Sequence, residues 1–325
     1  MTAALLEVEN LATHFFTRGG TLKAVDGVSF QLQAGEILGL VGESGSGKTV
    51  TGFSLLGLVD QPGRIVSGSI RLDGTELVGM RPRHLRRLRG RKIAMVFQDP
   101  ATTLNPVLTI AKQMRLAMRA HKFDGRWRAR RRAVELLTKV GIPDAAARLD
   151  DHPHQFSGGM RQRVAIAIAM MHEPKLIICD EPTTALDVSI QAQILTEIKS
   201  LVTESGTALI WISHDLATVS SLASRIMVMY AGRIVEEGPT AAVLREPRHP
   251  YTRGLVGSLP AANTAGADLV QIPGMPPKLS DLPKGCAFQP RCDRAAEACA
   301  VMPDLVADGD RAVRCHFPLH VPEAA

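Results

Sequence analysis

Short runs of consecutive apolar residues recur along the first 250 residues of the chain. Five runs consist of apolar residues and glycine, at residues 37–41, 93–97, 176–179, 208–212 and 226–230. Longer segments with helical spacing lie between several of them. Short apolar runs alternating with helices are typical of a parallel sheet covered on both faces. The pattern therefore predicts an α/β fold.

Three other segments complete this part of the chain. Residues 7–33 and 69–73 alternate polar and apolar positions, which predicts a small antiparallel sheet. Residues 231–236 follow the last apolar run and predict a hairpin that closes the domain. The stretch from about 99 to 172 is basic, favours helix and has few β-branched runs, so we expect a helical subdomain inserted between two core strands.

The composition changes near residue 250. Residues 251–325 hold nine of the twenty prolines and four of the five cysteines. Few helical or strand patterns continue there. We therefore expect two domains, an α/β domain over 1–250 and a small, irregular, cysteine-rich module over 251–325.

The overall composition is that of a globular protein, with 45% hydrophobic and 22% charged residues. This balance excludes a disordered chain, a coiled coil or a collagen-like repeat. No apolar run reaches the roughly 18 residues that a membrane-spanning helix needs. The first residues lack the basic and apolar regions of a signal peptide, so we expect a cytosolic location.

The net charge of +6 is unevenly distributed. Residues 81–92 and 126–132 carry twelve basic and no acidic side chains, so the remainder of the chain has a net charge of −6. Three interpretations are open: two solvated faces, a nucleic-acid patch, or contact with an anionic membrane leaflet. Aromatic residues make up only 4%, which disfavours base-stacking platforms for single strands.

A glycine-rich sequence follows the first apolar run and fits the phosphate-loop pattern. It reads Gly42-Glu43-Ser44-Gly45-Ser46-Gly47-Lys48-Thr49 and opens a predicted helix. Glycines at these positions let backbone N–H groups converge on phosphate at the helix N-terminus. Lys48 would reach the β- and γ-phosphates and Thr49 would bind Mg²⁺. The sequence therefore predicts nucleoside triphosphate binding.

Two adjacent acids end the third apolar run. Asp180 would hold Mg²⁺, and Glu181 is placed to polarise an attacking water. Two carboxylates at the mouth of a buried strand are costly unless a cation or ligand uses them. A plain acidic helix start is the alternative, which the phosphate loop upstream disfavours.

A third motif, Phe156-Ser157-Gly158-Gly159-Met160-Arg161-Gln162-Arg163, lies between the phosphate loop and the acidic pair. It resembles the signature of ATP-binding cassette (ABC) ATPases, with Phe and Met where Leu and Gln are commonest. This resemblance implies the P-loop ABC cassette, with a mixed central sheet, an antiparallel β subdomain and an inserted helical subdomain. It also implies that Ser157, Gly158 and Gly159 contact the γ-phosphate held by an opposite subunit.

Further positions match the family one by one. Gln98 is similar to the Q-loop glutamine, which touches Mg²⁺ or water. Ala185-Leu186-Asp187 is similar to the D-loop, and His214 to the switch histidine that contacts the γ-phosphate. Phe15 or its neighbour Phe16 is similar to the aromatic residue that stacks on adenine; a core role is the alternative for these phenylalanines.

The resemblance narrows to the oligopeptide/dipeptide branch of ABC importers. Asp99-Pro100, the run at 249–253 and the tail motifs at 285–292, 299 and 313–315 carry it. It implies an ATPase that powers peptide import, with Glu181 as general base and Lys48, His214 and Gln98 as catalytic partners. The implied partners are a second ATPase subunit, two transmembrane permease subunits and an extracytoplasmic solute-binding protein. The family resemblance implies that the second ATPase is a paralogue. The implied location is peripheral, at the cytoplasmic face of the inner membrane.

Cys286, Cys292, Cys299 and Cys315 are spaced Cys-x5-Cys-x6-Cys-x15-Cys. Four clustered cysteines in a cytosolic chain suggest metal, and thiolates suit both tetrahedral Zn²⁺ and a 4Fe–4S cluster. The residues alone do not choose between zinc, a cluster, and free thiols or partial disulfides. The family resemblance implies a 4Fe–4S cluster in some members.

The competing function is a soluble ABC ATPase that acts on nucleic acid or ribosomes, which the two arginine-rich stretches suggest. Ribosome-associated relatives usually carry two cassettes in one chain, whereas this sequence has one phosphate loop and one signature. We therefore expect no nucleic-acid partner.

Overall fold

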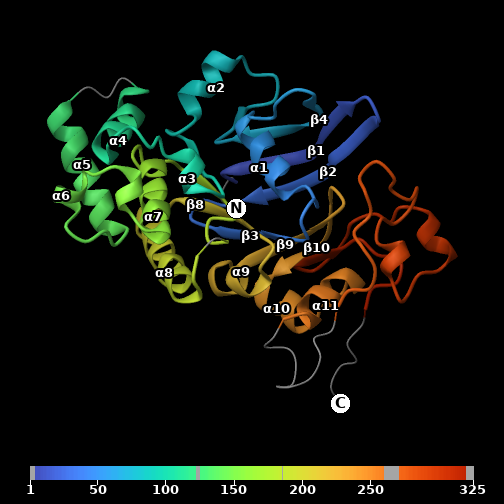
Figure 1. The fold of residues 1–325 in the computed structure, drawn as a ribbon. Helices are drawn as coiled ribbons and strands as arrows, with labels where there is room; N and C mark the ends of the chain where they lie inside the picture. The colour runs from blue at the N-terminus through green and yellow to red at the C-terminus, as the bar shows by residue number, and fades with distance from the viewer. Residues whose placement is uncertain (1–3, 122–124, 185, 260–270, 320–325) are drawn as a thin grey trace. The chain divides into compact units, whose positions relative to one another are not determined.

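The computed structural model describes residues 4–121, 125–184, 186–259 and 271–319 (Figure 1). The chain divides into two compact units, which are described separately. The first holds Gly79–Ile210, Leu32–Glu36 and the described residues before Leu6. The second holds Leu6–Gln31, Ile37–Val78 and the described residues from Trp211 onward.

The first unit contains two parallel strands and a group of helices. Its strands β6 (Ile93–Val96) and β7 (Leu176–Asp180) pair in parallel, as the apolar runs predict. The helices are α2 (Pro82–Leu88), α3 (Pro100–Thr103), α4 (Ile110–Arg119), α5 (Arg126–Lys139), α6 (Ala145–Arg148), the 3₁₀ turn η1 (Pro153–Gln155), α7 (Gly158–Ala169) and α8 (Val188–Ser205). Strand β8 (Ala208–Ser213) begins in this unit.

Helices α3 to α7 occupy the stretch in which we expected a helical subdomain. Helix α4 presents Ile110, Met114 and Met118 to the interior at helical spacing. Helix α5 contributes buried Leu136 and Leu137 from its C-terminal half. Both helices contact α7, so this part of the chain has an apolar core of its own. Figure 1 shows the same helices in colours that run from teal through green to yellow-green.

The second unit contains the antiparallel sheet that the alternating pattern predicts. Its strand order is β2-β1-β4-β5. The strands are β1 (Leu6–Thr17), β2 (Gly20–Leu32), β4 (Gly63–Leu72) and β5 (Thr75–Glu76). Strand β1 pairs with β4 along most of its length, with an irregularity between Glu9 and Thr13.

A mixed sheet forms the rest of the second unit. Strand β3 (Ile37–Val41) pairs in parallel with β9 (Arg225–Tyr230), and β9 pairs in antiparallel with β10 (Arg233–Pro239). The two residues between β9 and β10, Ala231 and Gly232, both have positive φ, which is the geometry of a tight hairpin. The predicted hairpin is thereby confirmed.

The helices of the second unit are α1 (Lys48–Leu56), α9 (Leu216–Leu222), α10 (Thr240–Arg245) and α11 (Pro250–Gly257). Helix α9 packs directly on β3 at Gly39, where an added Cβ would lie 2.1 Å from a methyl group of Val219. Only glycine permits this close approach of helix and strand.

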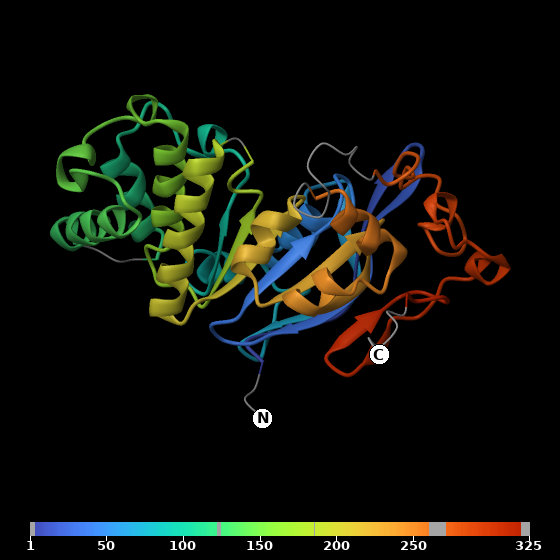
Figure 2. The ribbon, with the colours of Figure 1, turned by 90° about the horizontal axis from the view of Figure 1, so that it is seen from below.

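The C-terminal stretch is less irregular and less separate than the sequence suggests. It contains α11, the 3₁₀ turns η3 (Gln289–Arg291) and η4 (Glu297–Ala300), and a hairpin of β11 (Val306–Asp308) and β12 (Arg311–Val313). Strand β12 pairs with β10, so the tail extends the mixed sheet (Figure 2, red arrow). The compact units accordingly do not divide near residue 250, where the composition changes.

A buried ion pair joins the tail to the sheet. Glu236 of β10 is fully buried and accepts a hydrogen bond from Arg311 Nη2 of β12 at 2.8 Å. Its carboxylate also accepts the backbone N–H groups of Arg248 and His249, at 2.9 and 2.8 Å. Three donors satisfy this carboxylate, as a buried charge requires.

Among the described residues, no helix has both the length and the apolar character needed to cross a membrane.

Replacing Glu236 by glutamine should destabilise the protein strongly, because the buried Arg311 would lose its charged partner. We expect a loss of about 3 kcal/mol in the free energy of unfolding, measured by urea denaturation. The matched control is Asp150→Asn, which breaks the exposed Arg130–Asp150 pair and should cost less than about 1 kcal/mol. Equal effects of the two substitutions would contradict the structural role of Glu236.

Candidate functional site

The phosphate loop connects the end of β3 to the start of α1, and its backbone passes close to two strands. A Cβ at Gly42 would lie 2.2 Å from the carbonyl oxygen of Met229, and one at Gly47 would lie 2.2 Å from that of Ala24. Both glycines also have positive φ, of 154° and 106°. The loop can therefore take this course only without side chains at these two positions.

The polar groups of the loop suit an anion. Helix α1 has nine residues and no side-chain cap, so its N-terminus is open to an acceptor. The hydroxyl of Ser46 is buried and has no hydrogen-bond partner among the described residues. An uncapped helix N-terminus beside an unpaired hydroxyl fits the oxygens of a phosphate group.

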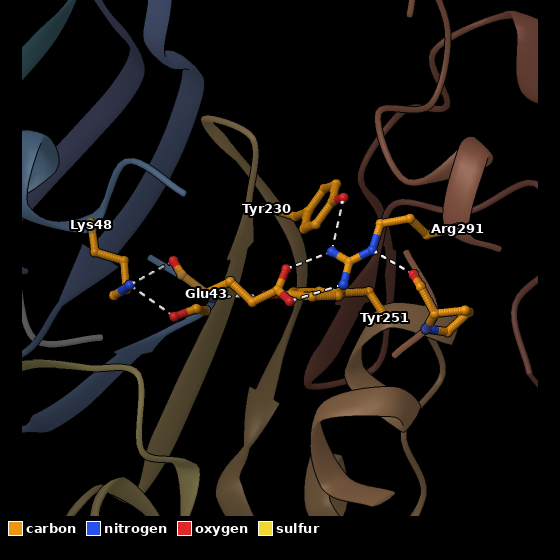
Figure 3. Close-up of polar contacts among 7 residues, drawn as sticks. Glu43, Lys48, Tyr230, Tyr251 and Arg291 are labelled. Carbon is orange, nitrogen blue, oxygen red and sulfur yellow. Dashed lines mark hydrogen bonds and ion pairs between the residues drawn. The ribbon is translucent and has the colours of Figure 1, made fainter. Parts of the chain in front are cut away.

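Lys48 lies under the loop. Its side chain is buried, and its Nζ donates to the carbonyl oxygens of Gly42 at 2.8 Å and Glu43 at 2.9 Å (Figure 3). These two bonds hold the ammonium group against the arch of the loop. The charge is thus placed beside the open helix N-terminus, where the phosphates of a nucleotide are predicted to bind.

Glu43 of the loop makes two contacts that the sequence gives no reason to expect. Its backbone N–H donates to the hydroxyl of Tyr251 at 2.8 Å, and its carboxylate pairs with Arg291 (Figure 3). Both partners lie more than 200 residues downstream. The family resemblance covers their segments, yet no motif spacing connects them to the phosphate loop.

Tyr251 is fixed by the start of α11. His249 caps this helix, and its Nδ1 accepts the backbone N–H of Tyr251 at 3.0 Å. Burial lowers the pKa of His249 to about 3, so the imidazole is neutral and keeps the free lone pair that this cap needs. The cap thereby holds the buried Tyr251 ring, whose hydroxyl contacts Glu43.

Glu181 and Gln98 come together in the first unit. Gln98 follows β6, and its Nε2 donates to Glu181 Oε2 at 3.3 Å. The hydroxyl of Thr184 donates to the same oxygen at 3.2 Å. Glu181 has a φ of 45°, a strained conformation for a residue with a side chain, directly after the buried Asp180 that ends β7. Strained backbone conformations of this kind cluster at active sites, where they hold a side chain in a required orientation.

The signature motif caps helix α7. Ser157 is the N-cap, and its Oγ accepts the N–H of Met160 at 3.3 Å. A Cβ at Gly159 would lie 2.6 Å from Ile190 of α8, so glycine permits the close packing of these two helices. Ser157 itself is exposed, so the N-terminus of this twelve-residue helix lies at the surface.

Two other predicted residues lie next to the ends of elements. His214 is exposed directly after β8. Asp187 is the N-cap residue of α8 but its side chain makes no capping hydrogen bond; Ala185 of the same motif lies outside the described residues.

Phe15 and Phe16 point to opposite faces of β1. Phe15 shares its face with Thr13, which hydrogen-bonds to Ser54 of α1. Phe16 lies on the other face with the guanidinium of Arg64 over its ring, 4.4 Å from the centroid. Phe15 is therefore the phenylalanine on the side of the phosphate-loop helix.

The four tail cysteines line one cavity, together with Phe288 and His249. Burial raises the pKa of Cys286, Cys292 and Cys315, and neighbouring thiolates of the set raise it further. Within the described residues, however, no three histidine, cysteine or acidic side chains are arranged to hold a metal ion. The donor chemistry suits a metal centre, but this arrangement of the side chains does not form one.

Comparison with known families gives two matches. A family described as ABC transporter matches residues 25–184. A family described as oligopeptide/dipeptide transporter, C-terminal region, matches residues 235–299.

Two curated relatives match over nearly the whole chain. The dipeptide transport ATP-binding protein DppD of Escherichia coli (strain K12) is 46% identical over 97% of this chain and 97% of its own. The oligopeptide transport ATP-binding protein OppD of Salmonella typhimurium is 46% identical over 96% of this chain and 93% of its own.

Solved structures agree in fold. The dimeric ATP-binding cassette MJ0796 bound to ADP and Pi superposes with a TM-score of 0.65 at 26% identity, over 72% of this chain and 98% of its own. The CbiO1 protein of Clostridium perfringens gives a TM-score of 0.64 at 27% identity, over 75% and 92%. The fold and the phosphate loop define a P-loop ATP-binding cassette, which confirms the cassette part of the predicted fold. A separate cysteine-rich module is not supported by the described residues. The chain belongs to the ABC transporter family, as the resemblance implied.

Replacing Gly47 by alanine should destabilise the loop severely, because the new Cβ would collide with the carbonyl of Ala24. We expect a loss of about 3 kcal/mol or more in the free energy of unfolding without nucleotide. The control is Gly45→Ala: Gly45 also has positive φ, of 78°, but nothing lies within 4 Å of an added Cβ. That variant should lose only about 1–2 kcal/mol. Similar losses in both variants would show that the close approach is not what constrains the loop.

Proposed function

We propose that this chain is the ATP-binding, ATP-hydrolysing subunit of an ABC importer for dipeptides, oligopeptides or related small solutes. The observation that carries the proposal is similarity along the whole chain to dipeptide and oligopeptide transport ATP-binding proteins. The match of residues 235–299 to the C-terminal region of oligopeptide/dipeptide transporters adds to it, because that region lies outside the general cassette match.

The phosphate loop, residues 42–49, would bind the phosphates of ATP. The unpaired Ser46 hydroxyl, the uncapped start of α1 and the buried Lys48 ammonium support this role. Glycine at 42, 45 and 47 keeps the backbone N–H groups accessible, with Glu43 and Ser44 completing the arch. Phe15, on the α1 side of β1, would stack on the adenine.

Glu181 would act as the general base toward the attacking water. The bonds from Gln98 and Thr184 support this role, because they orient the Glu181 carboxylate through one of its oxygens. His214 and Lys48 would stabilise charge on the transferred phosphoryl group. Thr49, Asp180 and Gln98 would hold Mg²⁺, which when bound neutralises phosphate charge.

Ser157, Gly158, Gly159 and Asp187 would act across an interface, toward the ATP of a second ATPase subunit. The exposed N-terminus of α7 supports this role, since it offers N–H groups to an anion from outside the chain. The solved relative that is a dimer with ADP and Pi is consistent with it. From the family resemblance we propose that the second ATPase is a paralogue.

The remaining partners would be two transmembrane permease subunits and an extracytoplasmic solute-binding protein. The chain would lie at the cytoplasmic face of the inner membrane, bound to the permease. No observation favours a nucleic-acid function: α5 arginines engage acids within the chain, as in the pairs Arg130–Asp150 and Arg132–Glu135.

Replacing Glu181 by glutamine should slow ATP hydrolysis by about 100- to 1,000-fold, because the variant lacks the base. Equilibrium ATP binding should change little, since the phosphate loop is untouched. Steady-state turnover of the chain assembled with its second ATPase subunit and nucleotide titration of the purified chain measure the two quantities. Glu204→Gln is the matched control, since Glu204 is an exposed residue of α8, and its turnover should equal that of the unmodified protein. Normal turnover in Glu181→Gln would refute the role of Glu181.

We further propose, from the family resemblance, that Cys286, Cys292, Cys299 and Cys315 bind a 4Fe–4S cluster, with zinc as the alternative. Their common cavity supports the proposal, and the lack of a formed metal site among the described residues weighs against it. Iron and acid-labile sulfide analysis of anaerobically purified protein, with the visible absorption spectrum, tests it. We expect about four irons and four sulfides per chain; one zinc, or no metal, would contradict the cluster.

A further inference from the structure

Arg291 reaches the phosphate loop from the C-terminal tail. It ends the turn η3, and its side chain is 4% exposed. Its Nη1 and Nη2 donate to the two carboxylate oxygens of Glu43, at 2.7 and 3.0 Å (Figure 3). Two parallel bonds of this kind fix both the distance and the plane of the pair, which a lysine cannot do.

The guanidinium is itself held from several sides. Its Nε donates to the carbonyl oxygen of Pro273 at 2.9 Å, and Nη1 also lies 3.3 Å from the hydroxyl of Tyr230. The rings of Tyr230 and Phe288 lie about 6 Å from it. Arg291 is thus a rigid support rather than a mobile surface side chain.

Glu43 is consequently held at three points. Arg291 binds its carboxylate, Tyr251 accepts its backbone N–H, and Lys48 donates to its carbonyl oxygen. The first two contacts come from the tail, beyond the usual elements of the cassette. The tail segment Met275–Ser280 also lines the same cavity as loop residues 43–46, so the tail lies beside the loop at more than one place.

We propose that Arg291 is a positioning residue for ATP, which holds the phosphate loop in its binding shape through Glu43. The inference rests on the proposed ATP-binding function. A loop ordered before the nucleotide arrives loses less entropy on binding, so removing the support should weaken binding. Once ATP is bound, its phosphates order the loop themselves, so the chemical step should change little.

The test is Arg291→Lys, which keeps the positive charge but cannot form the two-bonded pair. We expect the Kd and KM for ATP to rise about tenfold while kcat stays within about twofold. Arg253→Met is the matched control: it removes an exposed ion pair of the same tail, with Asp293, and should leave the KM unchanged. Circular dichroism and the melting temperature of each variant show whether it is folded.

A double-mutant cycle separates positioning from general stability. If Arg291 acts through Glu43, the combined variant Glu43→Gln/Arg291→Lys should have nearly the same KM for ATP as the more impaired single variant. A second double variant, Glu43→Gln/Arg291→Met, removes both charges and so leaves no ion unpaired in the interior. It is expected to fold, and to show the same rise in KM, even if Arg291→Lys is unstable.

Three results would overturn the inference. These are an unchanged KM in the folded Arg291→Lys variant, a fall in kcat at constant KM, and multiplicative effects in the double variant. The unmodified protein provides the separate check on function: if the chain does not bind ATP, and its assembly with the second ATPase subunit does not hydrolyse it, the proposed function fails. If binding and hydrolysis are both observed and the Arg291 variants match the unmodified protein, only the positioning role fails.

Discussion

The structure depends on one close approach, that of the phosphate-loop backbone to the strands beside it. At Gly42 and Gly47 the loop passes so near the carbonyl groups of Met229 and Ala24 that no side chain fits between them. This contact sets where α1 begins and therefore where its free N–H groups point. The location of the buried Lys48 follows, because its ammonium group is bonded to the carbonyls of the same arch. If the loop did not contact the strands, neither the N–H groups of α1 nor the Lys48 ammonium group would have a fixed position.

Buried charges connect the tail to this arrangement. Glu236 pairs with Arg311 and Glu43 pairs with Arg291, and in both pairs the arginine comes from the tail. A buried pair adds little net stability compared with apolar residues of the same shape, but it penalises any arrangement that leaves one ion alone. The two pairs therefore favour a single packing arrangement of the tail, on β10 and beside the loop. Exposed polar side chains in their place would be compatible with many arrangements.

The sequence predicts much of the fold because its signals are local. Apolar runs identify β3, β6, β7, β8 and β9, and the glycine pattern of 42–49 identifies a loop whose geometry depends on those glycines. The hydrogen bond between Gln98 and Glu181 is not predicted by their motifs, although both residues follow strands that pair in parallel. The contacts of Glu43 are not anticipated, because they are set by how η3 and α11 pack. Likewise β12 is a three-residue strand without a clear pattern, and only its pairing with β10 reveals it.

The long separation between Glu43 and Arg291 has a consequence for synthesis of the chain. A polypeptide emerges from the ribosome N-terminus first, at about 5–20 residues per second. Arg291 lies 248 residues after Glu43, so it follows the loop by roughly 10–50 s. During that interval the residues of the loop have been synthesised, but Glu43 has neither its guanidinium nor its tyrosine partner. The nascent cassette therefore passes through a stage in which its phosphate loop is present without the support that only the nearly finished chain supplies.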